Sequence, residues 1–312
     1  MAHNPPHRMG RTHRMGRTHR MGRAHRMGRA RRAGDTRRNL LFALPMALIG
    51  VLLVALPLIY VLGTSLVATG ESFSLRATFT LDNYRRLLRA DYLLVFWGSL
   101  KLAFLTTLVS LLIGYPFAYC MARSSRRVKP LLMMLVIIPF WTSALVRIFG
   151  WKILLQANGP INAVLKSLGL IEKNIRFLGS YGAVLLAMVY CMISFMILPC
   201  HSAVDKMDMT LVEAARDLGS PPWRAFIDVT LPLTLPGILA GCVLVFVPSV
   251  GIFYLSDIMG GGLVLVGNLI RDQLLKVRDW NTGSAMSMVL IFITAGVYLV
   301  YRKSGGDDLG VF

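Results

Sequence analysis

The chain of 312 residues is 55% hydrophobic and only 16% charged, with a mean hydropathy of +0.60. A soluble domain has about 45–50% apolar and about 25% charged residues, so the composition argues against a soluble class and favours a membrane protein. The net charge of +19 does not indicate nucleic-acid binding: 12 of the 34 Lys and Arg precede the first apolar segment, most of the others flank apolar segments, and no zinc-finger spacing is present.

A low-complexity basic arm occupies residues 1–39. The hexad HRMGRT or HRMGRA recurs in it, starting at His7, His13, His19 and His25. The arm cannot bury enough apolar surface to offset the entropy of ordering, so we expect it to be disordered. Its histidines recur six apart without Cys or carboxylate neighbours, so we expect no metal site. The expected role is a cytoplasmic tail near anionic lipid, and a start at Met27 or Met46 is an alternative.

Six apolar segments follow the arm. Each approaches the ~20 residues with which a helix crosses ~30 Å of hydrocarbon. Their approximate bounds are 40–67, 93–122, 131–150, 181–204, 232–257 and 284–301. Because every backbone polar group in lipid needs an internal partner, we expect these segments to be helices. The predicted fold class is therefore an all-α membrane protein with six transmembrane helices over residues 40–303, followed by a short tail over 304–312.

The distribution of positive charge predicts the orientation. With the N-terminus inside, the inside segments carry 21 Lys and Arg and the outside loops carry 11. Most of this bias comes from the arm, but the short run at 123–129 adds four basic residues on the same side. Positive charge in short loops marks the cytoplasmic side. We therefore expect a multi-pass protein with both termini in the cytoplasm.

One motif distinguishes between classes of membrane protein. Between the fourth and fifth segments, residues 213–219 read EAARDLG, and residues 229–232, after a gap of nine residues, read VTLP. This resembles the EAA motif of bacterial ABC importer permeases, which reads EAA, three residues, G, nine residues, I-x-L-P. Val229 stands where the family has Ile. The resemblance implies the type I importer permease fold in the bacterial inner membrane. The coupling residues that it implies are Glu213, Ala214, Ala215, Gly219, Leu231 and Pro232.

The loop at about 205–231 also has the composition of two short helices. The alanine pair favours helix and leaves a small surface that another protein can approach closely. Glu213 lies near the helix start, where its charge suits the helix dipole. We expect Gly219 and the two prolines after it to end this helix, and a second helix to begin near Trp223 and run into the fifth segment. In the resembling family such a coupling helix sits in a cleft of the ATP-hydrolysing subunit.

The sequence contains no motif for ATP hydrolysis. It has no G-x-x-x-x-G-K-[ST] phosphate loop, no HExxH metal motif and no GxSxG nucleophile turn. We therefore expect a transport subunit rather than an enzyme, with no cofactor of its own. The resemblance implies that ATP and Mg are bound by separate ATPase subunits.

Longer stretches resemble one subfamily, the spermidine/putrescine permeases. They are residues 139–151 (PFWTSALVRIFGW), residues 251–261 (GIFYLSDIMGG), the pair Gly241-Cys242 and the triplet Arg278-Asp279-Trp280. The resemblance runs over 40–302, omits the arm, and is strongest to the first of two non-identical permease subunits. It implies three kinds of partner besides lipid and the polyamine: a homologous second permease, two ATPase subunits and a periplasmic solute-binding protein. It implies no nucleic-acid partner.

A pathway for a polyamine needs carboxylates or carbonyls at intervals and aromatic faces for cation–π contact. Asp257 is the one carboxylate inside a predicted segment, near its outer end, and an ionisable residue there is a candidate for function. Phe253 and Tyr254 precede it at helical spacing, and Trp141 is a further aromatic candidate. The alternative for Asp257 is a position in water or an ion pair with Arg147 or Arg271. The alternative for Trp141 and Tyr254 is anchoring at the membrane–water interface.

These observations predict half of an alternating-access pathway for spermidine or putrescine. Permeases for another small solute, such as ferric iron, an amino-acid derivative or thiamine, share the fold and are the first alternative. A secondary transporter acting alone, or a membrane anchor without transport activity, is a further alternative. A secondary transporter would call for inverted repeats, and the sequence shows no convincing internal repeat.

Overall fold

The computed structural model describes residue 45 and residues 48–70 and 78–303. The predicted arm at 1–39 and the tail at 304–312 lie outside these residues. The chain divides into two compact units, residues 1–60 and 61–312. In the first unit, the described residues 48–60 belong to the apolar helix Leu48–Ser65. The second unit contains the other apolar helices and the motif loop.

Helices make up most of the described residues of the second unit, and the one β pairing among these residues is an isolated bridge between Val67 and Phe79. The helices before the motif loop are α2 (Asp82–Leu87), α3 (Ala90–Ala122), α4 (Val128–Trp141), α5 (Ala144–Leu154), α6 (Pro160–Ser167) and α7 (Tyr181–Lys206). Those of the loop and after it are α8 (Thr210–Asp217), α9 (Pro222–Ala225), η1 (Phe226–Thr230), α10 (Leu231–Gly251), α11 (Tyr254–Met259), α12 (Val266–Asp272), η2 (Gln273–Val277) and α13 (Trp280–Lys303).

Five helices among the described residues are long and apolar enough to cross a membrane, and a bent pair, α4 with α5, makes six if it counts as one span. The five are Leu48–Ser65, Ala90–Ala122, Tyr181–Lys206, Pro222–Gly251 and Trp280–Lys303. Each of the six predicted segments therefore overlaps described apolar helix, the third as a bent pair, while residues 40–44, 46 and 47 of the first segment lie outside the described residues. The second and last of these helices begin a few residues before the predicted start.

The third segment, expected as one helix over 131–150, is bent by 96° between α4 and α5. Thr142 and Ser143 have extended backbone at the bend, with ψ of 142° and 131°. The Thr142 hydroxyl donates to the carbonyl oxygen of Pro139 at 3.1 Å, which gives that carbonyl a partner other than the next helical N–H. A side-chain hydrogen bond thus accommodates the bend.

The fifth segment was expected to reach residue 257, but α10 ends at Gly251. Ile252 is extended, with ψ of 121°, and α11 starts separately at Tyr254. Pro248 lies one turn before this break and cannot donate a helical hydrogen bond. Asp257 therefore lies in the short helix α11 and not inside the long apolar helix.

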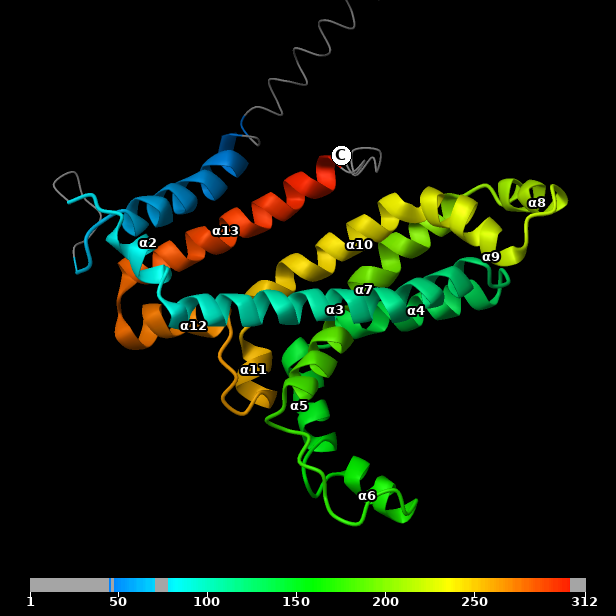
Figure 1. Ribbon diagram of the computed structural model, residues 1–312, viewed down its shortest axis with the longest axis horizontal. Helices are drawn as coiled ribbons and strands as arrows, with labels where there is room; N and C mark the ends of the chain where they lie inside the picture. Colours follow the sequence, from blue (N-terminus) through cyan, green and yellow to red (C-terminus); the bar gives the residue numbers. More distant parts are fainter. Residues whose placement is uncertain (1–44, 46–47, 71–77, 304–312) are drawn as a thin grey trace, which may run out of the picture. The chain divides into compact units, whose positions relative to one another are not determined.

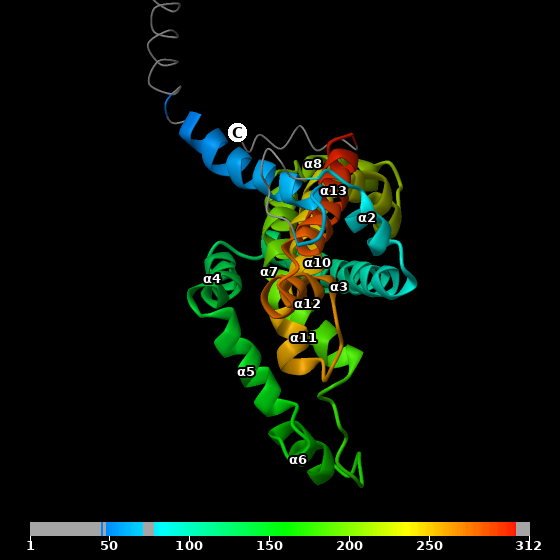
Figure 2. The same cartoon turned by 90° about the vertical axis from the view of Figure 1, so that its left-hand side faces the viewer.

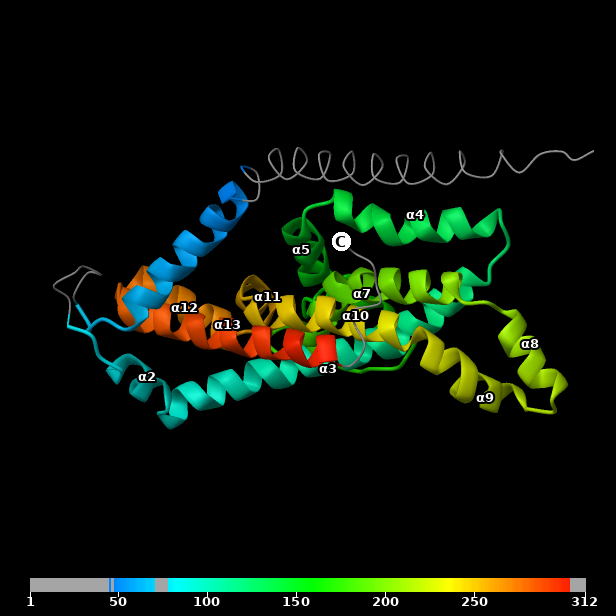
Figure 3. The ribbon, with the colours of Figure 1, turned by 90° about the horizontal axis from the view of Figure 1, so that it is seen from above.

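The core of the second unit lies where α3, α7 and α10 pack together along their lengths (Figures 1 and 3). Its largest buried side chains include Leu102 of α3 and both Met188 and Met196 of α7. Gly241 of α10 permits close contact, because a Cβ there would lie 2.7 Å from the sulfur of Met196. Small residues at such positions let helix backbones approach, as is usual between membrane helices.

The bent pair lies to one side of this core. Figure 2 shows α4 beside the group formed by α3, α7 and α10, and α5 and α6 continuing downward from it. Val136 is the one buried side chain of α4, and the Ser194 hydroxyl of α7 donates to its carbonyl oxygen at 3.2 Å. Most of α4 is thus an exposed apolar surface, as expected of a helix that faces lipid or another subunit.

Candidate functional site

The motif residues Glu213, Ala214 and Ala215 lie on α8, a helix of eight residues in the loop after α7. Glu213 is in the first turn and is exposed, as is Ala214, whereas Val212 is buried. The helix packs through its inner side against α9 and η1. Figure 3 shows α8 and α9 at the end of the group formed by α3, α7 and α10. The motif thus presents a small, acidic surface to the exterior of the unit.

Asp208 precedes α8 and organises its first turn. Its Oδ1 accepts the Thr210 N–H at 3.0 Å and the Thr210 hydroxyl at 2.8 Å. Both hydrogen bonds lower the pKa of the Asp208 carboxyl, because they stabilise its charged form. The bond from the backbone N–H has the larger effect and the bond from the hydroxyl the smaller. Asp208 was not among the predicted site residues, although Asp before a helix is a recognisable capping signal in sequence.

Gly219 ends α8 in the left-handed conformation, with φ of +87°. Its N–H donates to Arg216 O at 2.9 Å, and the Ser220 N–H donates to Ala215 O at 3.1 Å. This pair of bonds is the Schellman motif, in which glycine is favoured because it has no Cβ. The expected end of the first helix at Gly219 is therefore confirmed.

The second helix of the loop starts at Pro222 and continues through η1 into α10. Leu231 and Pro232 lie at the start of α10, in the same continuous helix. The Phe226 ring of η1 meets the rings of Tyr115 and Tyr119 of α3 edge to face, each with centroids 6.1 Å apart. The loop is thus connected to α10 by helix and to α3 by aromatic packing.

The predicted pathway residues separate into two places. Phe253, Tyr254 and Asp257 lie together at α11, where the two rings meet edge to face with centroids 6.3 Å apart. Trp141 lies on another element, at the end of α4, and its side chain is 78% exposed. Arg147, one of the two arginines considered as a partner of Asp257, lies instead over the Tyr190 ring at 5.7 Å.

Asp257 is held from both sides. One carboxylate oxygen accepts the side-chain N–H of Asn268 at 2.6 Å, and the other pairs with the Arg271 guanidinium. Arg271 also donates twice to Asp272, at 2.9 and 2.8 Å, and its guanidinium lies 5.2 Å from the centre of the Phe253 ring. The alternative that Asp257 pairs with Arg271 is therefore confirmed. Its role in a pathway stays a prediction.

Asn268 and Asp272 belong to this cluster and were not predicted. The Asn268 side chain is buried; its Oδ1 accepts from the Ser256 hydroxyl and the Leu265 N–H. These bonds fix the amide that orients Asp257. The sequence offered only a weak signal for this cluster, namely the three polar residues Asn268, Arg271 and Asp272 within one short helix. The contact between Asp257 and Asn268, 11 residues apart, depends on how the chain reverses between α11 and α12.

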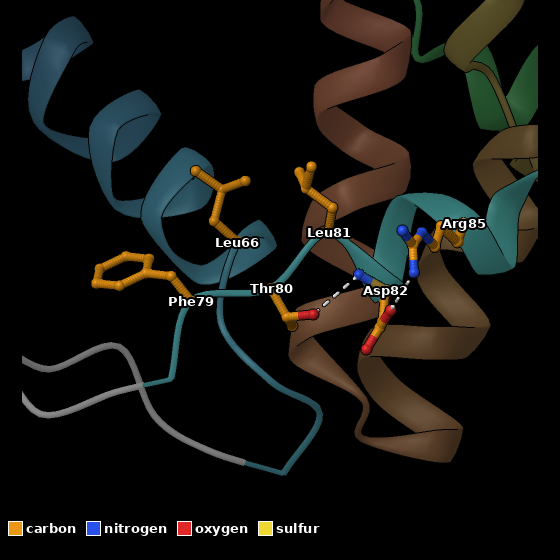
Figure 4. Close-up of a pocket in the computed structure, with 6 residues that line it drawn as sticks. All are labelled: Leu66, Phe79, Thr80, Leu81, Asp82 and Arg85. Carbon is orange, nitrogen blue, oxygen red and sulfur yellow. Dashed lines mark hydrogen bonds and ion pairs between the residues drawn. The ribbon is translucent and has the colours of Figure 1, made fainter.

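A separate open hollow of about 450 Å³ lies beside α2 (Figure 4). The residues that line it are Leu66, Phe79, Thr80, Leu81, Asp82 and Arg85. Thr80 Oγ1 accepts the Asp82 N–H at 3.1 Å, and Asp82 lies 3.6 Å from Arg85. These polar groups satisfy one another within a helix start, and no predicted site residue lines the hollow.

Comparison with known proteins gives the family. Residues 110–302 match the family model described as "Binding-protein-dependent transport system inner membrane component". The chain is 44% identical over 255 residues to the "Spermidine/putrescine transport system permease protein PotB" of Escherichia coli (strain K12), covering 81% of this chain and 93% of that one. The protein of the same name from Haemophilus influenzae is 42% identical over 252 residues, covering 80% and 88%.

The fold has solved counterparts as well. The crystal structure of a bacterial ABC transporter that imports the acidic polysaccharide alginate contains a chain that matches with a TM-score of 0.66 at 17% identity, covering 88% of this chain and 99% of that one. This similarity concerns the fold alone. The family match and the identities above lead to one conclusion: the chain belongs to the inner-membrane components of binding-protein-dependent transport systems.

Proposed function

We propose that the chain is the membrane-spanning permease subunit of an ATP-driven polyamine importer and forms half of the pathway for spermidine or putrescine. The observation that carries this proposal is the 44% identity, over nearly the whole of the relative, to a protein named as a spermidine/putrescine permease. The chemistry at α11 supports it, because Asp257 and the Phe253 ring both contact one cationic group, the Arg271 guanidinium, as they would contact an alkylammonium group.

The proposed assembly contains this chain, a homologous second permease, two ATPase subunits and a periplasmic solute-binding protein. The binding protein would deliver the solute to the outer loops. ATP and Mg would be bound by the ATPase subunits. Both termini would lie in the cytoplasm, as the charge distribution predicts.

Within this assembly, α8 is the proposed contact with an ATPase subunit. Three features support the assignment: the exposed Glu213 and Ala214, the sharp helix end at Gly219, and the continuous helix from Pro222 to Gly251. Movement of an ATPase subunit against α8 would be transmitted along this helix into the core. Alternating access would then follow from movement of α10 together with α3 and α7, which it packs against.

The test is transport by the complete importer in proteoliposomes, with ATP enclosed and radiolabelled spermidine or putrescine supplied with the binding protein. ATP-dependent uptake of a polyamine is the expected result. ATP hydrolysis that is stimulated by the binding protein without uptake of either polyamine would contradict the substrate and leave the permease role in place.

A further inference from the structure

The Asp257 cluster contains a cation of its own. The Arg271 guanidinium pairs with the Asp257 carboxylate and lies 5.2 Å from the centre of the Phe253 ring. These are the two contacts, a carboxylate and an aromatic face, that would bind the ammonium group of a polyamine. The side chains of Arg271 and Asp257 are 25% and 38% exposed, so a solute can reach them.

We propose that Arg271 is a tethered competitor of the transported cation: it occupies the cation site of Asp257 and Phe253 between transport events, and a substrate ammonium displaces it. This inference rests on the proposed polyamine function and adds a residue that sets the affinity. It differs from a static ion pair because Arg271 must leave Asp257 when the substrate arrives.

Asp272 gives the displaced arginine a second partner. Asp272 already accepts hydrogen bonds from Nε and Nη2 of Arg271, at 2.9 and 2.8 Å. Arg271 contacts Asp257 through Nη1 alone. Arg271 can therefore release Asp257 and keep two hydrogen bonds. This lowers the cost of exchange, since a charged side chain without a partner would be disfavoured.

The carboxylate itself is held in place during such an exchange. Asn268 donates to the other oxygen of Asp257 at 2.6 Å and also to the Phe253 carbonyl at 3.2 Å. Asn268 is buried and its own oxygen is bonded to Ser256 and to the Leu265 N–H. Asn268 therefore ties the carboxylate to the backbone of Phe253, and the proposal requires only Arg271 to move.

A tethered competitor suits a passage site, which must bind its ion strongly enough to admit it and weakly enough to release it. With Arg271 present, the apparent affinity for the substrate cation is the intrinsic affinity multiplied by the fraction of time that Asp257 is free of Arg271. Without Arg271, the carboxylate would be open and the cation would bind more tightly. Exposed ion pairs of this kind contribute modestly, so a change of about two- to fivefold is expected.

The experiment compares the spermidine concentration that gives half-maximal ATP-dependent uptake in Arg271→Gln, Asp257→Asn and the double variant. We expect Arg271→Gln to lower that concentration about two- to fivefold and Asp257→Asn to raise it. The double variant should behave as Asp257→Asn, and Arg271→Lys should stay near the wild type. Lys276→Gln is the matched control, because it removes one positive charge that contacts Asp272 at 2.8 Å and not Asp257.

A purely structural ion pair predicts a different pattern, in which Arg271→Gln and Asp257→Asn impair uptake in the same direction. That result, or equal effects of Arg271→Gln and Lys276→Gln, would overturn the proposal. Thermal denaturation of each variant complex shows whether loss of uptake reflects misfolding. If Arg271→Gln misfolds, Arg271→Met takes its place and should likewise lower the half-saturating spermidine concentration, while Arg271→Lys, which keeps the charge, should stay near the wild type.

A second measurement separates this inference from the proposed function. 4-Fluorophenylalanine at position 253 of the complete importer in nanodiscs reports by ¹⁹F NMR on the cation above the ring. Titration with spermidine should shift the resonance, with half-saturation at lower concentration in Arg271→Gln. A shift without uptake would contradict polyamine transport and support the cation site. Uptake without any shift would support transport and contradict the role of Arg271.

Discussion

Gly237 of α10 packs against Ala203 of α7 with no room for a side chain between them. A Cβ at position 237 would lie 2.4 Å from the Ala203 Cβ and 2.8 Å from the carbonyl oxygen of Pro199. Backbone atoms cannot move aside as the end of a flexible side chain can. The close approach of α7 and α10 therefore depends on the absence of a side chain at this position.

We expect Gly237→Ala to destabilise the unit by about 1–3 kcal/mol, because overpacking forces backbone shifts. Gly296→Ala, in α13, is the matched control, since a Cβ there meets nothing within 4 Å. Unfolding by SDS, followed by circular dichroism, compares the two. An equal midpoint for both variants would contradict the tight contact.

The turn at Gly219 gives a prediction about coupling. Gly219→Ala places a Cβ at φ +87°, which costs about 1–2 kcal/mol, whereas Gly219→Asn should be tolerated because Asn adopts this conformation more readily. We expect Gly219→Ala to reduce ATP-dependent uptake and the recovery of the ATPase with the permease, and Gly219→Asn to retain most of both.

The same assay checks Glu213, whose exposed carboxylate is proposed to face the ATPase. Glu213→Ala should lower uptake without changing the stability of the permease, because the side chain is outside the core. Full uptake and normal ATPase recovery in both Glu213→Ala and Gly219→Ala would rule out α8 as the coupling helix.

Asn83 gives a prediction about stability. It is fully buried, and its side-chain nitrogen donates to the carbonyl oxygens of Ser65 and Val67 at 3.0 and 2.8 Å. Asn83→Ala removes this donor from two carbonyls, and an unsatisfied buried group costs about 1–3 kcal/mol. Asn174→Ala, which loses an exposed hydrogen bond to Asn158, should change stability by less than about 0.5 kcal/mol. Thermal denaturation in detergent would detect the difference, and equal melting temperatures would contradict it.

Asp208 gives a prediction about pH. Its pKa is lowered in the folded protein, so its contribution to the start of α8 is present above the pKa of the unfolded chain. The contribution is lost as the pH falls through the lowered, folded value. Thr210→Val removes the hydroxyl donor and keeps the N–H, so the pKa of Asp208 should rise part of the way to its ordinary value. Carboxyl ¹³C NMR over the acidic pH range measures the pKa of Asp208 in the wild type and in Thr210→Val. An unchanged pKa in the variant would contradict the hydrogen bond from the Thr210 hydroxyl.

The motif loop shows which structural features can be predicted from neighbouring residues alone. The helix over the EAA residues, its end at Gly219 and the second helix starting near Trp223 were all expected from propensity, glycine and proline signals, and the structure has them. These features depend on neighbouring residues only. The π-helical η1 and its contact with Tyr115 were not expected, because they depend on packing against α3.

The apolar helices show the same division. Hydropathy identified all six apolar segments, since the need to satisfy the backbone in lipid depends on composition and length. It did not identify the 96° bend after Trp141 or the early end of α10, where a hydroxyl or an extended residue interrupts an otherwise apolar run. Proline near each break was visible in sequence, but proline also occurs inside α3 and α7 without ending them.

The sequence by itself determined the membrane class, the apolar segments, the EAA motif and the resemblance to importer permeases, because each is encoded in composition or in short spacings. Only the tertiary structure decided which residues meet. It moved Asp257 out of the long helix and into contact with Asn268 and Arg271, and it left Trp141 on another element. The physical reason is that such contacts depend on chain reversals, here between α11 and α12, whose geometry results from packing of the whole unit.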